Sequence, residues 1–410
     1  MRVCVATAGH LSTCPRMLKL ADALHAAGHD VHAVSARFVD WATDADRVLR
    51  ASRPWSWDVV DITPAGGPWR RRWSGARHRL ARTAAEPLND GACPAWLVER
   101  AFSRVGVELT RAIVESRAGA VVAGTSGALG AARLAAARLS ARLAIDLEDL
   151  HTAEREDSGA RLHHGLARLV LAAVLPQAHL VSTASARLAG AYRLAFGIDP
   201  VVMHNVWPLP ASPPAIDVAG GPVRFYWFSQ TIGPGRGLEE AIRAIGLAGV
   251  PARLCLRGHV DREYSETLRG WAHAHAPALA LAIEPPVPPD AVAATCAPFD
   301  IGLATELPVV ENRRLTLSNK LFMYMTTGLA IMATTMPSQV DVLGPLRDHV
   351  AWMDPSDPGS VVPTLRRWSA DPASLHAARS AACEAARQRW HWEHPLERDH
   401  WLQEFARTCA

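Results

Sequence analysis

The sequence predicts two α/β domains of similar size, each a Rossmann-like, doubly wound parallel sheet, joined by a proline-rich linker. Short apolar runs alternate with amphipathic helical stretches along the whole chain, and this alternation is typical of parallel sheets covered by helices. The alternation stops at residues 207–222, which contain five prolines, and then restarts. The length of 410 residues also fits two domains.

In the first half, the apolar run 2–7 predicts a strand. A loop at 8–14 follows, and then a helix that starts at Pro15 and ends at Gly28, because proline suits the first helical turn and glycine the end of a helix. Further strands of this half are predicted at 31–35, 59–62, 120–123, 143–147, 180–183 and 201–204.

The second half opens with a predicted strand at 223–228 and a helix whose apolar face begins at Leu238. The chain is predicted to be helical from about Pro372 onwards. The remaining strands of this half are predicted at 252–256, 279–283, 301–305, 330–334 and 349–353.

These patterns define the predicted domains. The N-terminal domain covers 1–206, the linker covers 207–222, and the C-terminal domain covers 223–390. A C-terminal helix covers 391–410, and packing against the N-terminal domain is one arrangement open to it.

Composition excludes several classes of protein. Apolar residues make up 49% and charged residues 20% of the chain, which indicates a globular protein rather than a disordered one. The net charge of +3 gives no bulk signal for nucleic acid. The seven cysteines form no CxxC pair, so we expect no disulfide framework, no metal site and a cytoplasmic location. The start does not resemble a signal peptide, and we expect no membrane-spanning helix.

The loop after the 223–228 strand is the first candidate for ligand binding, since ligands bind at the carboxyl ends of parallel strands. Gly233, Gly235 and Gly237 permit a tight turn and close approach of the backbone. Arg236 precedes a helix start, and both a guanidinium and a helix N-terminus suit phosphate. The alternative is a simple strand–helix turn with a solvated arginine.

The segment SNKLFMYMTTGLAIMAT is the second candidate. Ser318 is predicted to be the N-cap of a helix, which places Asn319 and Lys320 in its first turn. A cation beside the positive end of a helix is unfavourable unless an anion joins it. Because the chain has only two lysines, this placement predicts a phosphate site, with a surface lysine as the alternative.

Two loops of the first half are the polar candidates. Asp146, Glu148, Asp149 and His151 cluster after a strand, and crowded carboxylates with a histidine suit acid–base chemistry or sugar hydroxyl binding. Favourable acids at a helix N-terminus are the alternative explanation. In the loop after the first strand, we expect three residues to face an interdomain cleft, unless the histidine is an ordinary loop residue: His10, Ser12 and Thr13.

Four blocks, in this order, resemble the GT-B glycosyltransferases, most closely the retaining enzymes of family 4. They are HLSTCPRMLKLADALHAAGHDVHAVS, VVMHNVWP, GPGRGLEEAI and SNKLFMYMTTGLAIMAT. The resemblance implies two domains facing a cleft and transfer of a sugar from a nucleotide-diphosphate donor to an acceptor hydroxyl. It also implies retention of configuration, with no metal and no cofactor.

By this resemblance, Arg236 and Lys320 are catalytic and hold the donor diphosphate, with Asp149 and His151 as the catalytic candidates of the first domain. The diphosphate site also includes Gly233, Gly235, Ser318 and Asn319. The acceptor is expected to bind to the N-terminal domain and the donor to the C-terminal domain. The acceptor site comprises His10, Ser12, Thr13, Asp146 and Glu148.

Two departures from the family concern the nucleoside and the sugar. The Glu-x7-Glu signature has Leu315 and Met323 in its two positions, and Thr231 stands near the place of an expected arginine. We expect Gln230, Thr231, Glu306 and Glu311 to contact the nucleoside or the sugar instead.

Other functions stay open at this point. A GT-B subunit that binds a nucleotide or a partner without catalysis is one alternative, and a nucleotide-sugar epimerase is another. The acceptor is a glycan, a lipid-linked molecule or a small molecule. A nicotinamide-dependent dehydrogenase is disfavoured, because neither half opens with a GxGxxG turn.

The segment PWRRRWSGARHRLAR is basic and contains interleaved tryptophans. A solvated basic loop is the favoured interpretation, and peripheral contact with an anionic membrane is the alternative. Nucleic acid is not expected as a partner. Its tryptophans and arginines are Trp69, Arg70, Arg71, Arg72, Trp73, Arg77, Arg79 and Arg82.

Overall fold

The computed structural model describes residues 1–88, 93–216 and 220–409 of the chain. Residue contacts divide it into two compact units. Unit 1 comprises Met1–His204, Val310–Asn312 and Arg398–Ala410, and unit 2 comprises Asn205–Val309 and Arg313–Glu397. Residues 217–219 of the predicted linker and residue 410 of the predicted C-terminal helix lie outside the described residues.

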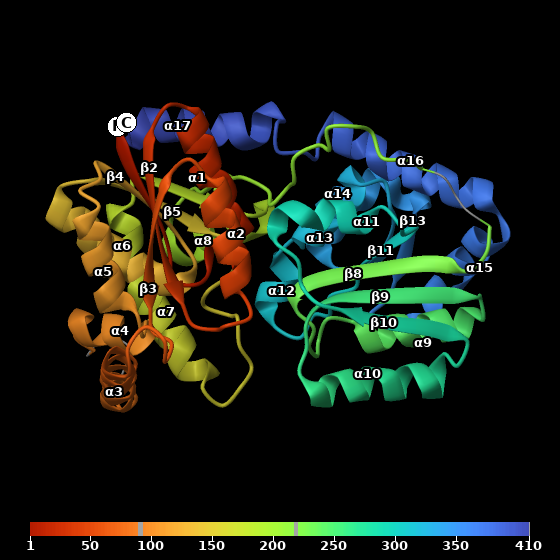
Figure 1. Cartoon of the computed structure of the whole chain (residues 1–410), viewed down its shortest axis with the longest axis horizontal. Helices are drawn as coiled ribbons and strands as arrows, with labels where there is room; N and C mark the ends of the chain where they lie inside the picture. The colour runs from red at the N-terminus through yellow and green to blue at the C-terminus, as the bar shows by residue number, and fades with distance from the viewer. Residues whose placement is uncertain (89–92, 217–219, 410) are drawn as a thin grey trace. The chain divides into compact units, whose positions relative to one another are not determined.

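Unit 1 contains a seven-stranded sheet in the order β3-β2-β1-β4-β5-β6-β7 (Figure 1). All neighbouring strands pair in parallel, so every strand ends at the same edge. The strands are β1 (Arg2–Thr7), β2 (Asp30–Arg37), β3 (Ser56–Asp61), β4 (Ala120–Gly124), β5 (Arg142–Leu147), β6 (Leu180–Thr183) and β7 (Val201–Val202).

Most helices of unit 1 lie between its strands in the sequence. The last helix, α17, is the C-terminal helix of the chain and packs against this sheet. α17 contacts β5 and β6, and Trp401 Nε1 on α17 donates to Ser182 Oγ at 3.2 Å. The helices are α1 (Pro15–Ala26), α2 (Thr43–Ser52), α3 (Pro68–Ala85), α4 (Ala95–Phe102), α5 (Gly106–Glu115), α6 (Ser126–Leu139), α7 (Ala160–Val174), α8 (Ala186–Phe196) and α17 (His400–Cys409).

Unit 2 contains a six-stranded sheet in the order β10-β9-β8-β11-β12-β13, again with parallel pairings. Its core includes Trp227, Ile242, Leu303 and Trp368. The strands are β8 (Val223–Thr231), β9 (Ala252–His259), β10 (Leu279–Glu284), β11 (Ile301–Ala304), β12 (Ala330–Thr334) and β13 (Val350–Met353).

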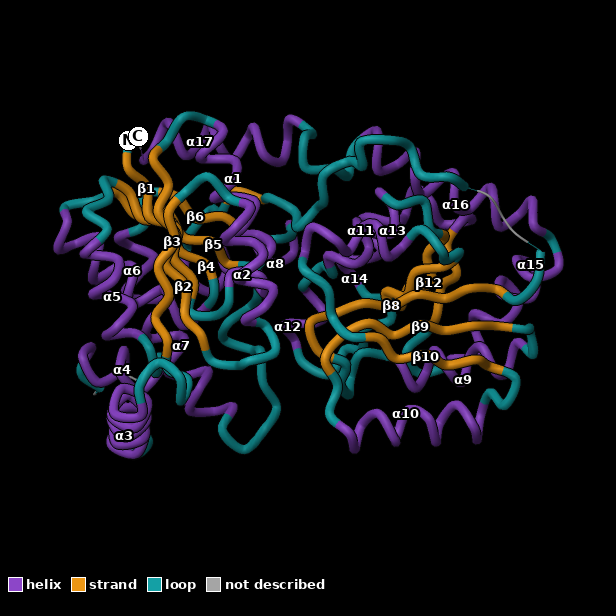
Figure 2. Tube along the Cα trace, viewed as in Figure 1, coloured by secondary structure: helices purple, strands orange, loops and turns teal. Residues whose placement is uncertain are grey.

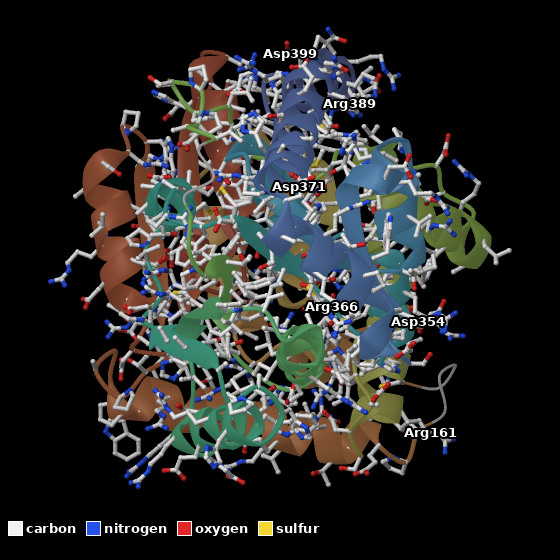
Figure 3. All side chains as sticks on the ribbon, turned by 90° about the vertical axis from the view of Figure 1, so that its right-hand side faces the viewer. Arg161, Asp354, Arg366, Asp371, Arg389 and Asp399 are labelled. Atoms are coloured by element: carbon white, nitrogen blue, oxygen red, sulfur yellow. The ribbon has the colours of Figure 1, made fainter. Side chains whose placement is uncertain are left out.

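Helices of unit 2 lie on both faces of this sheet, with α9 and α10 on one side and α13 and α14 on the other (Figure 1). Asp371 caps α16 by accepting from Ala373 N at 3.0 Å, and Arg366 Nε donates to Ala248 O at the end of α9 at 3.1 Å (Figure 3). The helices are α9 (Leu238–Ala248), α10 (Arg262–His275), α11 (Val292–Cys296), α13 (Asn319–Thr326), α14 (Pro337–Leu343), α15 (Val362–Ala370) and α16 (Pro372–Gln388), and α12 (Glu311–Leu315) contributes residues to both units.

The predicted fold class is confirmed, because both sheets are parallel and flanked by helices. One local prediction is wrong: the basic segment expected to be a loop forms α3. Pro68 starts this helix, and its interior contains no further proline, so Gly75 is the one residue that weakens it, and it does not suffice to break it. Within the described ranges, no helix has the length and apolar character that crossing a bilayer requires.

Substitution of Gly237 tests how tightly the turn before α9 is fixed. It adopts φ +70°, and a Cβ there would lie 1.8 Å from Thr305 O. We expect Gly237→Ala to lower the free energy of unfolding by about 3 kcal/mol, through overlap and backbone strain together, measured by urea denaturation.

Gly249 at the other end of α9 is the matched control. Its φ is +64°, but no atom lies within 4 Å of its would-be Cβ. Gly249→Ala should therefore cost only the backbone strain of about 1 kcal/mol. Equal losses in the two variants would show that the close approach to Thr305 does not constrain the turn.

Candidate functional site

The glycine turn of unit 2 lies between β8 and α9, as predicted. Gly235 and Gly237 both adopt φ +70°, and Thr305 Oγ1 donates to Arg236 O at 3.1 Å. The turn is therefore held against the carboxyl end of β11. The first turn of α9 already carries two acids, Glu239 and Glu240, so a phosphate would share that helix end with carboxylates of the protein.

Lys320 is buried in the first turn of α13 and forms an ion pair with Glu306 (Nζ–Oε1 2.6 Å). Its ammonium also lies 5.2 Å from the centre of the Trp227 ring. Ser318 occupies the predicted N-cap position, but its side chain does not cap the helix. Instead, Ser318 Oγ donates to Glu306 Oε1 at 3.1 Å. Glu306 thus supplies the anion that a cation at this helix end requires.

Two arginines add positive charge to this pair. Arg313 donates through Nη1 to Gly235 O, and Arg236 is half-buried on the same turn. Burial lowers the pKa of Lys320, and the charges of Arg236 and Arg313 lower it further against the opposing effect of Glu306. Burial would raise the pKa of Glu306, but Lys320 and Arg236 hold it below its usual range. Lys320 is thus paired with the ionised carboxylate of Glu306, and Arg236 and Arg313 add positive charge near this pair.

Glu306 retains binding capacity in this cluster, which we call the cation cluster of unit 2 (Arg236, Glu306, Arg313 and Lys320). Its second oxygen, Oε2, is buried and has no hydrogen-bond partner in the described protein. A buried acceptor of this kind costs free energy unless a donor reaches it. A hydroxyl of a bound ligand would satisfy it.

The other predicted donor residues lie near strand and helix ends of unit 2 or on α12. Gln230 and Thr231 are exposed at the end of β8, and Glu311 is exposed at the start of α12. Asn319 O accepts from Trp207 Nε1 at 3.0 Å, so its backbone is already engaged. Gly233 has no neighbour within 4 Å of a would-be Cβ, so its position has room for a ligand.

In unit 1, the loop after β1 is fixed by Asp46 of α2. His10 Nδ1 lies 2.7 Å from Asp46 Oδ2, and His10 Nε2 accepts from Phe38 N at 3.2 Å and Val39 N at 3.3 Å. Both ring nitrogens of His10 are therefore used within the protein. Ser12 N donates to Asp46 Oδ1 at 2.9 Å, whereas the buried Ser12 Oγ has no partner in the described protein.

Asp146, at the end of β5, is held by a buried arginine that the sequence analysis did not select. Arg16 donates to Asp146 through Nε at 2.7 Å and Nη2 at 2.5 Å, and Ser182 Oγ donates to Asp146 Oδ1 at 2.6 Å. Arg16 Nη1 also donates to Met203 O at 2.5 Å. The acceptor role of Asp146 stays a prediction, and its oxygens already bind protein groups. Thr13 Oγ1 likewise donates to His10 O at 2.8 Å.

The next two acids differ from Asp146 in their electrostatics. Burial raises the pKa of Glu148 to about 7, against the opposing charge of Arg16. Burial and the Glu154 carboxylate raise the pKa of Asp149. Asn312, which belongs to unit 1, donates from Nδ2 to Asp149 Oδ1 at 2.9 Å and accepts from Leu150 N at 2.6 Å. These contacts fix the loop after β5.

His151 forms a dyad with Glu154, which the sequence analysis did not select. The pair joins His151 Nδ1 and Glu154 Oε1, and His151 Nε2 is buried without a partner in the described protein. Burial would lower the pKa of His151, but Glu154 raises it above its usual value. A carboxylate that orients one imidazole nitrogen and leaves the other free is an arrangement suited to proton transfer.

Sequence reasoning missed Arg16, Glu154, Asn312 and Arg313 as participants. Each of these residues lies inside or beside a segment that the sequence analysis selected. Its contact could not be predicted, because the partner is distant in sequence or because the contact depends on how a loop folds. Arg16 and Asp146, for example, are 130 residues apart. Among the described residues, no group of three or more His, Cys, Asp or Glu side chains is arranged to hold a metal ion.

No protein-family model matches the sequence, and no curated protein matches it significantly. Solved structures do match. HepE from Anabaena, in complex with UDP and glucose, is similar with a TM-score of 0.67 at 17% identity, over 100% of this chain and 99% of that chain. Sucrose-phosphate synthase from Thermosynechococcus elongatus gives 0.64 at 12% identity, over 100% of both chains.

A third structure, S. aureus TarM with Fondaparinux, α-GlcNAc-glycerol and UDP, gives a TM-score of 0.64 at 8% identity, over 98% of this chain and 99% of that chain. The chain has the GT-B fold. At these identities, the likeness supports the architecture, and the chemistry must be argued from the chain's own residues.

Glu148 allows a test of the electrostatics of unit 1. Its pKa of about 7 in the folded protein exceeds the 4.5 of an unperturbed glutamate, so its ionisation destabilises the fold as the pH rises from about 5 to 8. Glu148→Gln cannot ionise. We expect the variant to gain about 2 kcal/mol of stability relative to wild type between pH 5 and pH 8, measured by urea denaturation at each pH.

Glu156, an exposed carboxylate on the same loop, is the control. Glu156→Gln should show the same dependence of stability on pH as the wild type. A Glu148→Gln variant whose stability difference from wild type is constant across this range would contradict the assigned burial effect.

Proposed function

We propose that this protein is a glycosyltransferase that transfers a hexose from a nucleotide-diphosphate donor to an acceptor hydroxyl. The observation that carries the proposal is the cation cluster of unit 2, in which Lys320 is paired with Glu306 and the charges of Arg236 and Arg313 act on this pair. It lies where parallel strands of a GT-B fold end, which is the usual position of ligands in such sheets.

The cluster suits the charge that develops during the reaction. When the bond between sugar and diphosphate breaks, negative charge grows on the leaving oxygens, and fixed cations stabilise it more in a buried site than in water. Lys320 and Arg236 bind and stabilise the diphosphate in this proposal. Arg313 positions the turn through Gly235, and Glu306 Oε2 accepts from a hydroxyl of the sugar or the ribose.

The His151–Glu154 dyad supplies the acid–base function of unit 1. Glu154 orients the imidazole through Nδ1, and Nε2 binds the acceptor hydroxyl or takes its proton. Asp149 is held by Asn312 and contributes to the same binding surface. Asp146 acts through its pairing with Arg16, which fixes the end of β5.

The finer features of the reaction are also proposals. Retention follows from the resemblance to family 4. Metal independence is proposed because three side-chain cations can supply the positive charge that a metal supplies in other transferases. A cytoplasmic location is proposed because all seven cysteines are free thiols. The acceptor is a glycan, a lipid-linked molecule or a small molecule.

Arg236 is the first residue to test, since it is half-buried and outside the buried ion pair. We expect Arg236→Ala to lower kcat by about 10²–10³-fold, as loss of a group that stabilises transition-state charge does. Turnover is measured with a panel of nucleotide sugars, and binding of uridine diphosphate is measured by thermal shift.

Arg243→Ala is the matched control, because Arg243 is exposed on α9 close to the same turn. It should keep wild-type turnover and the wild-type thermal shift. If Arg236→Ala also keeps both, Arg236 does not belong to the donor site. If no nucleoside diphosphate shifts the wild-type melting temperature, the cation cluster is not a diphosphate site.

Glu154→Gln tests the dyad through its pH dependence. The Glu154 carboxylate raises the pKa of His151, and a base must be unprotonated to act. Removing that charge lowers the pKa of His151, so the acid limb of the kcat/KM profile should move to lower pH, with a reduced maximum. Glu156→Gln should leave the profile unchanged, and an unmoved acid limb in Glu154→Gln would exclude His151 as the titrating base.

A further inference from the structure

α3 carries an exposed apolar stripe that its own unit leaves uncovered. Trp69, Trp73 and Leu80 are 79%, 70% and 72% exposed. Their spacing, with Ala76 between them, places them on one face of the helix. Ser74, Ala81 and Ala85 are the buried residues on the inward side. Figure 2 shows α3 end-on at the border of unit 1.

The same helix carries six arginines and no acidic residue. Helical geometry places Arg72 and Arg79 along one flank of the apolar stripe. Beyond them lies a groove of about 440 Å³ lined by Arg71, Arg72, His78, Arg79 and Arg104, and no acidic residue lines it. This flank therefore combines a row of guanidinium groups with an exposed apolar edge.

The arginines on this flank change the pKa values of the groups beside them. Burial lowers the pKa of Arg104, and the charges of Arg71 and Arg79 lower it further against the weaker opposing charge of Glu108. Burial, together with Arg82 and other arginines, lowers the pKa of His78. The opposite flank differs, because Arg77 is paired with Glu108 there (Nη2–Oε2 2.6 Å), and Asp58 and Glu115 line a groove with Arg70.

We propose that α3 docks unit 1 onto an anionic lipid bilayer. Trp69, Trp73 and Leu80 enter the interface between headgroups and acyl chains, and the groove flanked by Arg72 and Arg79 binds lipid phosphates. This is the chemistry of an interfacial helix, with large apolar side chains on one face and arginines beside it. Tryptophan suits this depth because its ring is apolar and its N–H is polar.

Charge complementarity selects the bilayer over a protein partner. Tryptophan and arginine also occur in protein–protein interfaces, but the groove beside this stripe is lined by arginines and His78 and by no acidic residue, so it complements a dense array of anions. An anionic surface offers many phosphates at once, and each basic residue near it adds to the attraction.

The test is co-sedimentation with vesicles of phosphatidylcholine that contain about a third phosphatidylglycerol. Wild-type protein should bind these vesicles, bind weakly to phosphatidylcholine alone, and bind less as salt is raised. Two multiple variants should each weaken binding at least about tenfold: the triple variant Trp69→Ser/Trp73→Ser/Leu80→Ser and the double variant Arg72→Glu/Arg79→Glu. The replaced side chains are exposed, so the variants should keep the wild-type melting temperature.

Two matched variants control for exposed apolar area and for charge. Leu194→Ser removes a side chain that is 90% exposed on α8, and Arg243→Glu/Arg269→Glu makes the same charge change at exposed positions of unit 2. Both should bind as the wild type does.

Equal binding of the wild type to neutral and anionic vesicles would overturn the proposal, and so would wild-type binding by the α3 variants. A third contrary result is that the wild type forms a dimer, which only the Trp69→Ser/Trp73→Ser/Leu80→Ser variant loses, and does not bind vesicles. The last result would assign the stripe to a second copy of the chain. The assay contains no donor or acceptor, so its outcome is independent of sugar transfer.

Discussion

The geometry of the candidate donor site depends on one carboxylate, that of Glu306 at the carboxyl end of β11. A buried ion pair gains little net stability, since desolvation of both charges opposes their attraction. Removing one partner leaves the other charge buried, which is strongly unfavourable. Glu306 therefore makes a buried ammonium tolerable at the start of α13, where the helix dipole opposes it. With Arg236 and Arg313 nearby, the cluster still has more positive than negative charge, and a diphosphate complements that excess.

The carboxylates of unit 1 differ in their surroundings, and these surroundings decide which of them can change charge near neutral pH. Asp146 is paired with Arg16, whereas burial raises the pKa of Glu148 to about 7. These two acids are two residues apart on the same strand end, yet one is locked in an ion pair and the other can change charge near neutral pH. Such divergence between neighbouring groups is how proteins separate structural from acid–base roles. The His151–Glu154 dyad extends this pattern, because Glu154 both orients the imidazole and favours its charged form.

The sequence predicted the fold well because most strands contain a short apolar run and most connections are marked by glycine, proline or a polar cluster. It also placed Lys320 in the first turn of α13, and it identified the need for an anion there. It could not show that the anion is Glu306, because that pairing depends on the path of the chain between β11 and α13. It likewise took the basic segment for a loop, because six arginines obscured the helical spacing of Trp69, Trp73 and Leu80. Pairings across long separations, such as Arg16 with Asp146, have no local signal.

There is a physical reason why the cation cluster contains arginine rather than a second lysine at position 236. Burial and neighbouring cations lower the pKa of Lys320, so a second lysine in place of Arg236 would suffer the same effect and would lose its proton more readily. A guanidinium keeps its charge in such surroundings, because its pKa lies far above neutrality. Its planar fork can also bind two phosphate oxygens at once. Arginine at position 236 therefore keeps its charge close to the buried ammonium of Lys320 and the carboxylate of Glu306.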